Sequence, residues 1–256
     1  MQLHYKVEGK GKPILLIHGL FGSLSNLSLL AKALSSEYEV ISIDLRNHGL
    51  SPHSDLHTYN AMAEDILTLV ELLCLDQVIL IGHSMGGKVA MKFAERCPEK
   101  VSHLVVLDIA PVSYFKGRHD NVFAGINEVS AYSNTITKRS EADSYLAMHV
   151  IDPSVRQFIL KSLKRSGDHF KWQFNAASLL HNYQHIMQWE MVTPFNGNTL
   201  FIKGENSEYI LPEYRDVIMQ QYPRAKAHVV ANTGHWLHAE KPAAVVRTIT
   251  RFLGNN

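Results

Sequence analysis

The chain has 256 residues, 46% of them hydrophobic, which is enough to bury one sizeable core in a single α/β domain. Its 25 basic and 24 acidic side chains leave a formal net charge of +1, so no overall field attracts nucleic acid or an anionic membrane. The composition therefore argues against a nucleic-acid-binding protein.

The cysteines and the N-terminal residues favour a cytoplasmic protein. Cys74 and Cys97 each lie inside an apolar helical pattern, so we expect buried, reduced thiols and no disulfide framework. Residues 1–9 alternate polar and apolar side chains and lack the pattern of an export signal. No stretch approaches the roughly 20 apolar residues that a membrane span needs.

The first half of the chain carries the apolar runs of a parallel sheet. Residues 3–7 alternate polar and apolar side chains, which indicates one arm of an antiparallel hairpin. The next runs lack this alternation and are typical of strands covered on both faces. They are residues 14–17, 40–43, 78–81 and 104–107. Helical spacing of apolar residues in the segments between them predicts a doubly wound arrangement of strands and helices.

The predicted alternation of strands and helices stops between residues 111 and 191. This segment holds aromatic and basic side chains in helix-like stretches without a strand run, and we interpret it as an inserted helical cap. The alternation then resumes, at residues 199–202, 212–221 and 227–230 and in a final helix. We therefore expect a core domain of residues 1–110 and 192–256 with a cap of residues 111–191.

Residues 82–86, Gly-His-Ser-Met-Gly, follow the strand at 78–81 and begin a helix. This context is that of a nucleophile elbow, in which a tight turn lifts a serine hydroxyl above the sheet edge. The turn leaves no room for side chains at the two flanking positions, and glycine occupies both. The pattern predicts Ser84 as a nucleophile and the amide of Met85 as an oxyanion donor.

The same residues also match part of a phosphate-binding loop. Gly82, Gly87 and Lys88 have the spacing Gly-x-x-x-x-Gly-Lys between a strand and a helix. Val89 follows, where such a loop needs a serine or threonine hydroxyl for magnesium, and no convincing metal-binding acid follows downstream. We therefore favour a nucleophile over a nucleotide-binding site.

The loop after the first parallel strand is the expected source of the second oxyanion amide. Residues 18–22 read His-Gly-Leu-Phe-Gly, and Leu20 is the candidate donor. The charged residues after the strand at 40–43, Asp44 and Arg46, are interpreted as braces between loops. Asn47 and His48, which follow them, are candidates to border the pocket.

A serine in a nucleophile elbow needs a histidine as general base, and in such folds this histidine follows the last strand. One of the fifteen histidines lies at that place. His235 falls in the loop between the last strand and the final helix, whereas His228 falls within the strand and His238 within the helix. We expect His235 to take the proton of Ser84. The helical spacing of His181 and His185 also permits metal binding, but neither they nor any other histidines form a convincing ligand set, so we predict no metal.

Several strings make the whole chain resemble the α/β-hydrolase superfamily, and most closely the YbfF-type bacterial esterases and thioesterases with a small helical cap. The strings are residues 18–23, 44–51, 82–88, 108–111, 234–236 and 240–242. The resemblance implies a doubly wound, mostly parallel eight-stranded sheet with an inserted helical cap. It also implies short-chain esters and acyl-coenzyme A thioesters as substrates.

The acid departs from the commonest arrangement of that superfamily, in which it lies three residues past a glycine after the seventh strand. Ser207 occupies that position here. A carboxylate is needed to fix the tautomer of the histidine and stabilise its charge, so the acid must come from elsewhere. Asp108, at the end of the strand at 104–107, is the candidate, and the resemblance implies the same choice. Glu205 and Glu208 remain alternatives.

The insertion is rich in aromatic residues that suit an acyl chain, although each of them also suits the core of the insertion itself. Lys116, Arg118 and His119 follow Asp108 closely and can meet a carboxylate or phosphate of a substrate. Solvated surface charge explains them equally well. The candidate pocket residues are Phe21, His83, Tyr114, Phe115, Arg118, Trp172 and Trp236.

These residues predict hydrolysis of carboxylic esters or acyl-coenzyme A thioesters through Ser84, His235 and Asp108, with an acyl-enzyme intermediate and no cofactor. Carbon–carbon bond hydrolases and perhydrolases share the same residues and remain alternatives. A ligand sensor that keeps the fold without turnover is a further alternative. The expected partner is a small-molecule ester or thioester, and both a monomer and a homodimer remain open.

Overall fold

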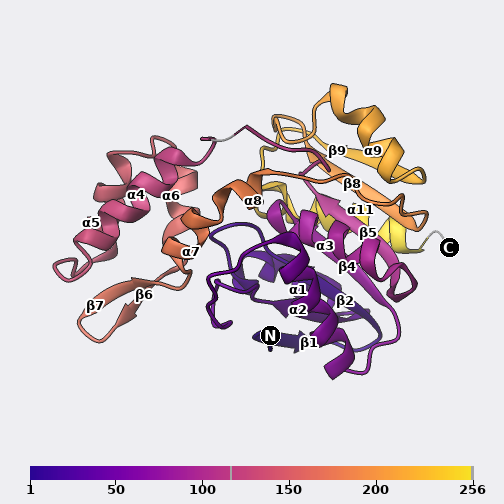
Figure 1. The fold of residues 1–256 in the computed structure, drawn as a ribbon, viewed down its shortest axis with the longest axis horizontal. Helices are drawn as coiled ribbons and strands as arrows, with labels where there is room; N and C mark the ends of the chain where they lie inside the picture. Colours follow the sequence, from indigo (N-terminus) through magenta and orange to yellow (C-terminus); the bar gives the residue numbers. More distant parts are fainter. Residues whose placement is uncertain (116, 255–256) are drawn as a thin grey trace.

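The computed structural model describes residues 1–115 and 117–254 and has a seven-stranded sheet at its centre (Figure 1). The strand order is β1-β3-β2-β4-β5-β8-β9, and all neighbours are parallel except β1 and β3. The strands are β1 (Tyr5–Glu8), β2 (Lys12–Ile17), β3 (Tyr38–Ile43), β4 (Val78–His83), β5 (Val101–Leu107), β8 (Asn198–Gly204) and β9 (Ala225–Val230). Each parallel strand contains a run expected from the sequence.

Two expectations for the sheet were wrong. Residues 3–7 do not form a hairpin with the strand that follows, because β2 is bonded on one edge to β3 and on the other to β4. β1 pairs with β3 instead and is the last strand at that edge of the sheet. The described residues form seven strands of the central sheet, one fewer than expected.

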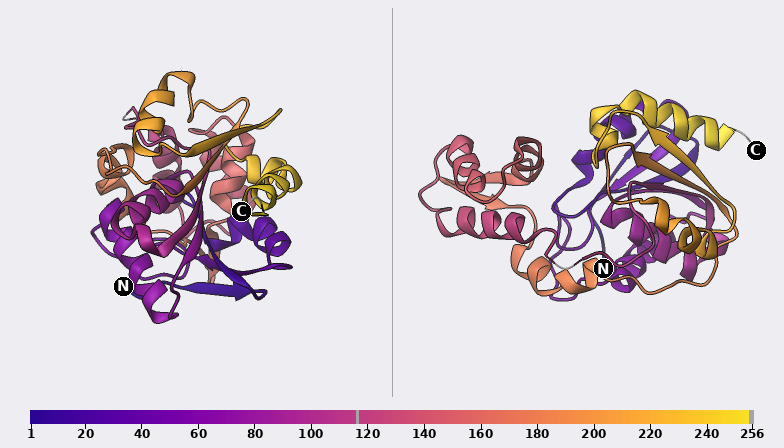
Figure 2. Two further views of the ribbon diagram at one scale, coloured as in Figure 1. Left: turned by 90° about the vertical axis from the view of Figure 1, so that its right-hand side faces the viewer. Right: turned by 90° about the horizontal axis from the view of Figure 1, so that it is seen from above.

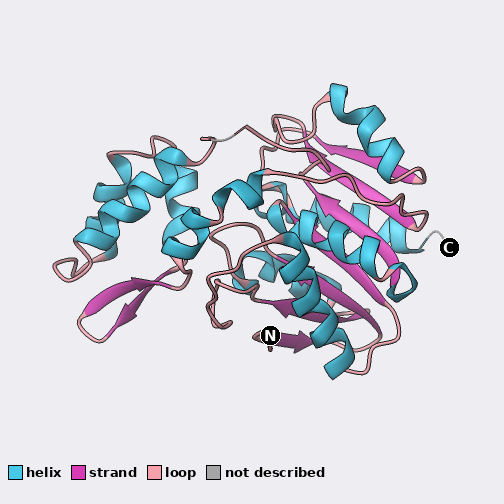
Figure 3. Cartoon of the chain, viewed as in Figure 1, coloured by secondary structure: helices cyan, strands magenta, loops and turns pink. Residues whose placement is uncertain are grey.

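Helices cover both faces of this sheet, as Figures 2 and 3 show. Leu15 and Ile17 of β2 belong to the buried cluster that includes the helices α2 (Tyr59–Leu72) and α3 (Met85–Arg96). Ile14 and Leu16 of the same strand belong to the cluster on the opposite face. That cluster includes α1 (Ser28–Leu34) and α11 (Pro242–Gly254). Because both faces are buried, the strands read as unbroken apolar runs.

Between β5 and β8 the chain leaves the sheet and forms a separate group of elements, which we call the insertion (Figures 1 and 2). It contains α4 (Asp120–Ala131), α5 (Arg139–Ala147), α6 (Pro153–Leu160), β6 (Leu163–Ser166), β7 (His169–Trp172), α7 (Ala176–His181) and α8 (Tyr183–Met187). The remaining helices of the core are α9 (Arg215–Gln221) and α10 (Leu237–Glu240).

The expectation of an insertion without strands was wrong. β6 and β7 pair as an antiparallel hairpin, with Ser166 opposite His169. The two residues between them, Gly167 and Asp168, make the turn, and Gly167 has a φ of 62°, a conformation that glycine adopts without steric cost. The hairpin is short and mostly exposed, so it carries no apolar run that the sequence pattern detects.

The insertion leaves and rejoins the core through two segments that lie side by side. The amide of Trp189 donates to the hydroxyl oxygen of Ser113 at 2.8 Å, and that hydroxyl donates to the carbonyl oxygen of Trp189 at 3.3 Å. Lys88 of α3 donates to the carbonyl oxygen of Val112 at 2.8 Å, and its Nζ lies 5.5 Å from the centre of the Trp189 ring. We call these paired segments the neck.

The two cysteines differ in their surroundings. Cys97 is buried and Cys74 is exposed, and both thiols are free. The expectation of burial was wrong for Cys74 because α2 ends before it, and the residue turns the chain away with a φ of 52°. In the part of the chain that the structure describes, the helices are all too short or too polar to pass through a bilayer.

Candidate active site

Ser84 occupies the turn between β4 and α3, at the centre of the sheet. Its φ of 53° and ψ of −122° form a strained combination for a residue with a side chain. A Cβ on Gly82 would lie 2.3 Å from the carbonyl oxygen of Gly86, and a Cβ on Gly86 would lie 2.3 Å from that of Ile17 in β2. Both distances are impossible contacts, so glycine is required at both positions, as the sequence predicted.

The loop after β2 lies directly beside this turn, because β2 is a neighbour of β4 in the sheet. A Cβ on Gly19 would lie only 3.2 Å from the Cβ of Ser84. The amide of Met85 is the first of α3. Within the described residues, the amides of Leu20 and Met85 donate to no protein acceptor. Two unused N–H groups therefore flank Ser84, which is what an oxyanion hole requires.

Asp108 and His235 are hydrogen-bonded to each other. His235 Nδ1 donates to Asp108 Oδ2 at 2.8 Å, and the aspartate is completely buried at the end of β5. The same carboxylate accepts from the amide of Gly204 at 2.9 Å and from the hydroxyl of Ser207. These donors satisfy a charge that is costly to bury alone. With Nδ1 acting as donor, Nε2 of the neutral ring is left as the proton acceptor.

The alternative acids bond elsewhere. Glu205 accepts from the amide of Asn232 at 2.7 Å. Glu208 has a side chain that is 80% exposed and lies 3.7 Å from Arg118. Among the described residues, Asp108 is the carboxylate that bonds to His235. Ser207 occupies the position that is commonly acidic in the superfamily, and it donates to Asp108 from there.

Ser84 and His235 line one cavity of about 210 Å³. Its walls are mostly apolar and come from both the core and the insertion. The lining residues are Gly19, Leu20, Phe21, His83, Ser84, Arg118, His119, Val122, Val155, Phe158, Ile159, Tyr209, His235 and Trp236. Among the described residues, no hydrogen bond joins the hydroxyl of Ser84 to His235.

The family model described as the alpha/beta hydrolase fold matches residues 12–242. The chain belongs to this family. It is 43% identical to the protein named esterase YbfF of Escherichia coli K12 over 97% of this chain and 95% of the relative. It is 45% identical to a protein named putative esterase/lipase of Haemophilus influenzae, over 100% of this chain and 88% of the relative. A solved structure titled marine microorganism esterase superposes with a TM-score of 0.94 at 34% identity, covering 98% of this chain and 99% of that one.

Four of the predicted pocket residues of this α/β hydrolase do line the cavity: Phe21, His83, Arg118 and Trp236. His119, which the sequence paired with Arg118 as a possible anion contact, lines it as well. Lys116 lies outside the described residues. Arg118 is therefore the cationic side chain that the described residues bring to the cavity wall.

The structure places the other three predicted pocket residues away from the cavity. Phe115 is 80% exposed. Tyr114 turns its hydroxyl to the core, where it donates to the carbonyl oxygen of Tyr209. Trp172 stacks on Phe174 within the insertion, with ring centroids 5.0 Å apart. Tyr114 and Trp172 lie in packing contacts because an aromatic residue of an insertion packs against its neighbours as readily as it lines a site, whereas Phe115 is exposed to solvent.

Several lining residues were not found from the sequence. Tyr209 stacks on His235 with ring centroids 3.9 Å apart, and Arg118 covers Tyr209 with its guanidinium 4.1 Å from the ring centre. Phe158 and Ile159 come from α6. Tyr209 lies two residues after Ser207, in the loop that the superfamily commonly uses for its acid. Its place in that loop is the sequence signal that could have identified it. The apolar residues of α6 carry no pattern that separates cavity lining from helix packing.

Burial keeps His83 and His119 on the cavity wall uncharged. His83 is buried, and this burial, aided by the nearby His238, holds its pKa well below 6.5. Its Nε2 donates to the carbonyl oxygen of His235 at 2.9 Å, which fixes the backbone that carries the catalytic candidate. Burial also lowers the pKa of His119 to about 4. These two histidines therefore add no charge to the cavity, whose walls are mostly apolar.

The structure argues against the phosphate-binding alternative. Lys88 is buried, and its amine donates to the neck and lies 4.8 Å from the ring centre of Tyr114. It is therefore directed into the packing of the neck and is unavailable to a phosphate held by the loop. Among the described residues, no group of three or more histidine, cysteine or carboxylate side chains is placed to hold a metal ion.

Proposed function

We propose that this α/β hydrolase is a serine hydrolase that cleaves carboxylic esters. The observation that carries the proposal is the bond from His235 to the buried Asp108, made on the wall of the same cavity that Ser84 lines. The ester class is supported by the relatives whose printed names are esterase and esterase/lipase.

The geometry supports a two-step mechanism. Ser84 Oγ attacks the ester carbonyl while His235 Nε2 takes its proton, and Asp108 stabilises the imidazolium that forms. The carbonyl oxygen becomes negative and accepts from the amides of Leu20 and Met85. Collapse of this intermediate expels the alcohol, which receives the proton from His235 and leaves an acyl group on Ser84. Water then attacks the acyl-enzyme by the same route and releases the carboxylic acid.

Residues 111–191 act in this proposal as a cap. The insertion contributes Val155, Phe158 and Ile159 to the cavity, and these apolar walls suit an acyl chain and exclude water around Ser84. Acyl-coenzyme A thioesters present the same carbonyl to the nucleophile, so we propose them as a second substrate class.

The proposal is tested by labelling the protein with a fluorophosphonate and locating the adduct by mass spectrometry. We expect the label on Ser84. The rates with p-nitrophenyl esters and acyl-coenzyme A thioesters of increasing chain length then identify the substrate class, with Ser84→Ala as the matched control.

Hydrolysis that is unchanged in Ser84→Ala would contradict the proposed nucleophile. A wild-type protein that binds esters without turnover would instead be the ligand sensor that shares this fold. Preferred cleavage of carbon–carbon bonds, or preferred formation of peracids, would move the chemistry to the other reactions that use the same three residues.

A further inference from the structure

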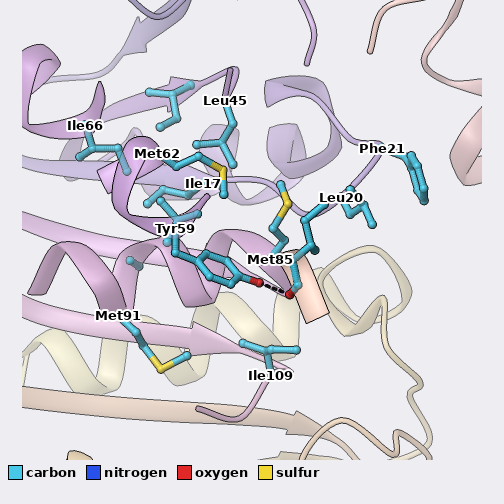
Figure 4. Packing of buried hydrophobic residues seen from close by; sticks show 14 of the residues in the cluster. Ile17, Leu20, Phe21, Leu45, Tyr59, Met62, Ile66, Met85, Met91 and Ile109 are labelled. Atoms are coloured by element: carbon cyan, nitrogen blue, oxygen red, sulfur yellow. Dashed lines mark hydrogen bonds between the residues drawn. The ribbon is translucent and has the colours of Figure 1, made fainter. Parts of the chain in front are cut away.

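Phe21 is held in a conformation that a residue with a side chain seldom adopts. It follows Leu20 directly in the loop after β2 and has a φ of 61°. Figure 4 shows Leu20, Phe21 and Met85 in the same region of the core cluster. The amide of Leu20 belongs to the Gly19–Leu20 peptide unit, and the amide of Phe21 belongs to the next unit along the chain. Only the two backbone dihedral angles of Leu20 separate these units, so holding the backbone of Phe21 restricts the directions in which the Leu20 amide can point. Whatever fixes Phe21 therefore also helps to aim this amide.

The amide of Phe21 is bonded to the loop after β3. It donates to Nε2 of His48 at 3.2 Å, and Nδ1 of His48 lies 2.9 Å from the carbonyl oxygen of Arg46. A carbonyl only accepts, so Nδ1 carries the proton and Nε2 is free to accept from Phe21. His48 is fully buried, and burial together with the nearby His18 holds its pKa well below 6.5. The ring therefore stays in the neutral form that this bond requires.

A second histidine makes the reverse connection. Nδ1 of His18 lies 2.8 Å from the carbonyl oxygen of Gly19, and Nε2 of His18 accepts from the amide of Leu45 at 3.0 Å. His18 thus reaches from the oxyanion loop to the loop after β3, while His48 reaches back. The two rings have centroids 5.0 Å apart. This reciprocal pair joins the two loops without a charge.

The carbonyl of Phe21 is bonded to the insertion. Ser162, between α6 and β6, donates its hydroxyl to this oxygen at 2.7 Å and is itself buried. The ring of Phe21 also packs against the insertion, with its centroid 5.1 Å from that of Phe123 and 5.3 Å from that of Phe174. One residue of the oxyanion loop is therefore fixed from the core at its amide and from the insertion at its carbonyl.

We propose that His48 and Ser162 are positioning residues that hold the backbone of Phe21 from both sides and thereby aim the Leu20 amide at the developing oxyanion. Neither residue touches the substrate. The Ser162 bond makes the alignment of the oxyanion donor depend on the seating of the insertion. This inference rests on the proposed function, in which Leu20 stabilises the oxyanion.

The test compares Ser162→Ala and His48→Leu, which each remove one bond to Phe21, with His48→Gln, which keeps an acceptor. Ser144→Ala, at an exposed serine of α5, and His53→Gln, at an exposed histidine, are the matched controls. We measure kcat and KM with p-nitrophenyl butyrate and the inhibition constant of an alkyl boronic acid, whose adduct with serine carries an oxygen in the oxyanion position. Thermal melting verifies that each variant is folded.

We expect Ser162→Ala and His48→Leu to lower kcat about tenfold to a hundredfold, because a small displacement of a catalytic group has an effect of this size. The inhibition constant of the boronic acid should increase by a similar factor, while KM should change by no more than about twofold. His48→Gln should recover most of the loss, and the two controls should behave as the wild type.

An active wild type together with unchanged kcat and boronic acid affinity in folded Ser162→Ala would overturn the positioning role. A rise in KM alone would do the same, because it would assign these residues to substrate binding. A wild type that hydrolyses no ester would instead refute the proposed function itself, so the two failures are distinguishable.

Discussion

The phenol ring of Tyr209 lies nearly flat against the imidazole of His235, with centroids 3.9 Å apart and planes inclined by 22°. The stack limits rotation of the imidazole about its bond to Asp108. We expect Tyr209→Leu to lower kcat about tenfold and Tyr209→Phe, which keeps the ring, to retain most of the activity. Steady-state kinetics of both variants check this. An equal loss in both would assign the effect to the hydroxyl, which lies 3.3 Å from His119 Nε2.

Replacing Asp108 by asparagine should remove most of the activity. An amide in this place no longer stabilises the imidazolium and favours the wrong tautomer, so we expect kcat to fall by about 10⁴-fold. Glu205→Gln and Glu208→Gln are the controls and should leave kcat within about twofold of the wild type. Pre-steady-state acylation measurements decide the point. If Asp108→Asn acylated at a near-normal rate and either control did not, the acid would be one of the glutamates.

Gly86→Ala should misplace the nucleophile. The added Cβ would lie 2.3 Å from the carbonyl oxygen of Ile17 and 2.4 Å from that of His18, both of them backbone atoms that shift only if β2 moves. We expect loss of fluorophosphonate labelling and a lower melting temperature. Gly254→Ala is the matched control, because nothing lies within 4 Å of its Cβ. A normally labelled, equally stable Gly86→Ala protein would show that the turn tolerates the movement.

The free energy of unfolding should decrease as the pH falls below the ordinary histidine pKa of 6.5. Burial, as the largest cause, lowers the pKa of both His57 and His238 to about 3 in the folded protein. Between pH 6.5 and about 3 the unfolded chain therefore binds protons that the folded one does not. Each such histidine contributes a loss of about 1.4 kcal/mol per pH unit within this range, with full stability retained above it.

Urea unfolding at a series of pH values measures this decrease directly. His57→Gln removes one of the titrating groups, so we expect a shallower dependence on pH in that variant, whereas Ser144→Ala at an exposed position of α5 should leave the slope unchanged. A stability that is constant down to about pH 4.5 in the wild type would refute the explanation.

Phe158→Ala should widen the range of acyl chains that the protein accepts. The rings of Phe158 and Trp236 lie 5.4 Å apart, between the cavity of about 210 Å³ and an adjoining groove of about 630 Å³ that both residues also line. Removing one ring joins the two spaces. We expect kcat/KM to rise for long-chain esters relative to short ones.

Val155→Ala is the control for this prediction, because Val155 lines the cavity but not the groove. It should enlarge the space without opening it into the groove. An identical chain-length profile in wild type and Phe158→Ala would show that the acyl group lies elsewhere.

The sequence alone predicted much of the core. Strands buried on both faces, such as β2 and β4, leave unbroken apolar runs, and the glycines of the Ser84 turn follow from close backbone contacts that no other residue permits. The candidates Ser84 and His235 were located because each follows a strand in a recognisable local context. Residues close together in the sequence carry this information, so it can be read without the structure.

What the sequence did not reveal depends on contacts between distant residues. β1 pairs with β3 because β2 has no free edge, which is a property of the whole sheet. The bond of Ser162 to Phe21 joins residues 141 positions apart. The charged residues of the loop that carries His48 were interpreted as braces, and Asp44 does accept from the amide of Leu24 at 2.7 Å. The additional connection through the neutral rings of His18 and His48 was not predicted. Nothing in the local pattern around these residues indicates their partners.

The paired segments of the neck have a consequence for how such a chain diversifies. Because the outgoing and returning backbones meet at Ser113 and Trp189, the intervening elements begin and end at almost the same point of the core. A segment of different length or fold can then be exchanged there by joining two adjacent ends, with no change to the strands that carry Ser84 and Asp108. If the proposed function holds, exchange of the insertion changes which substrates fit the cavity and leaves Ser84 and Asp108 in place.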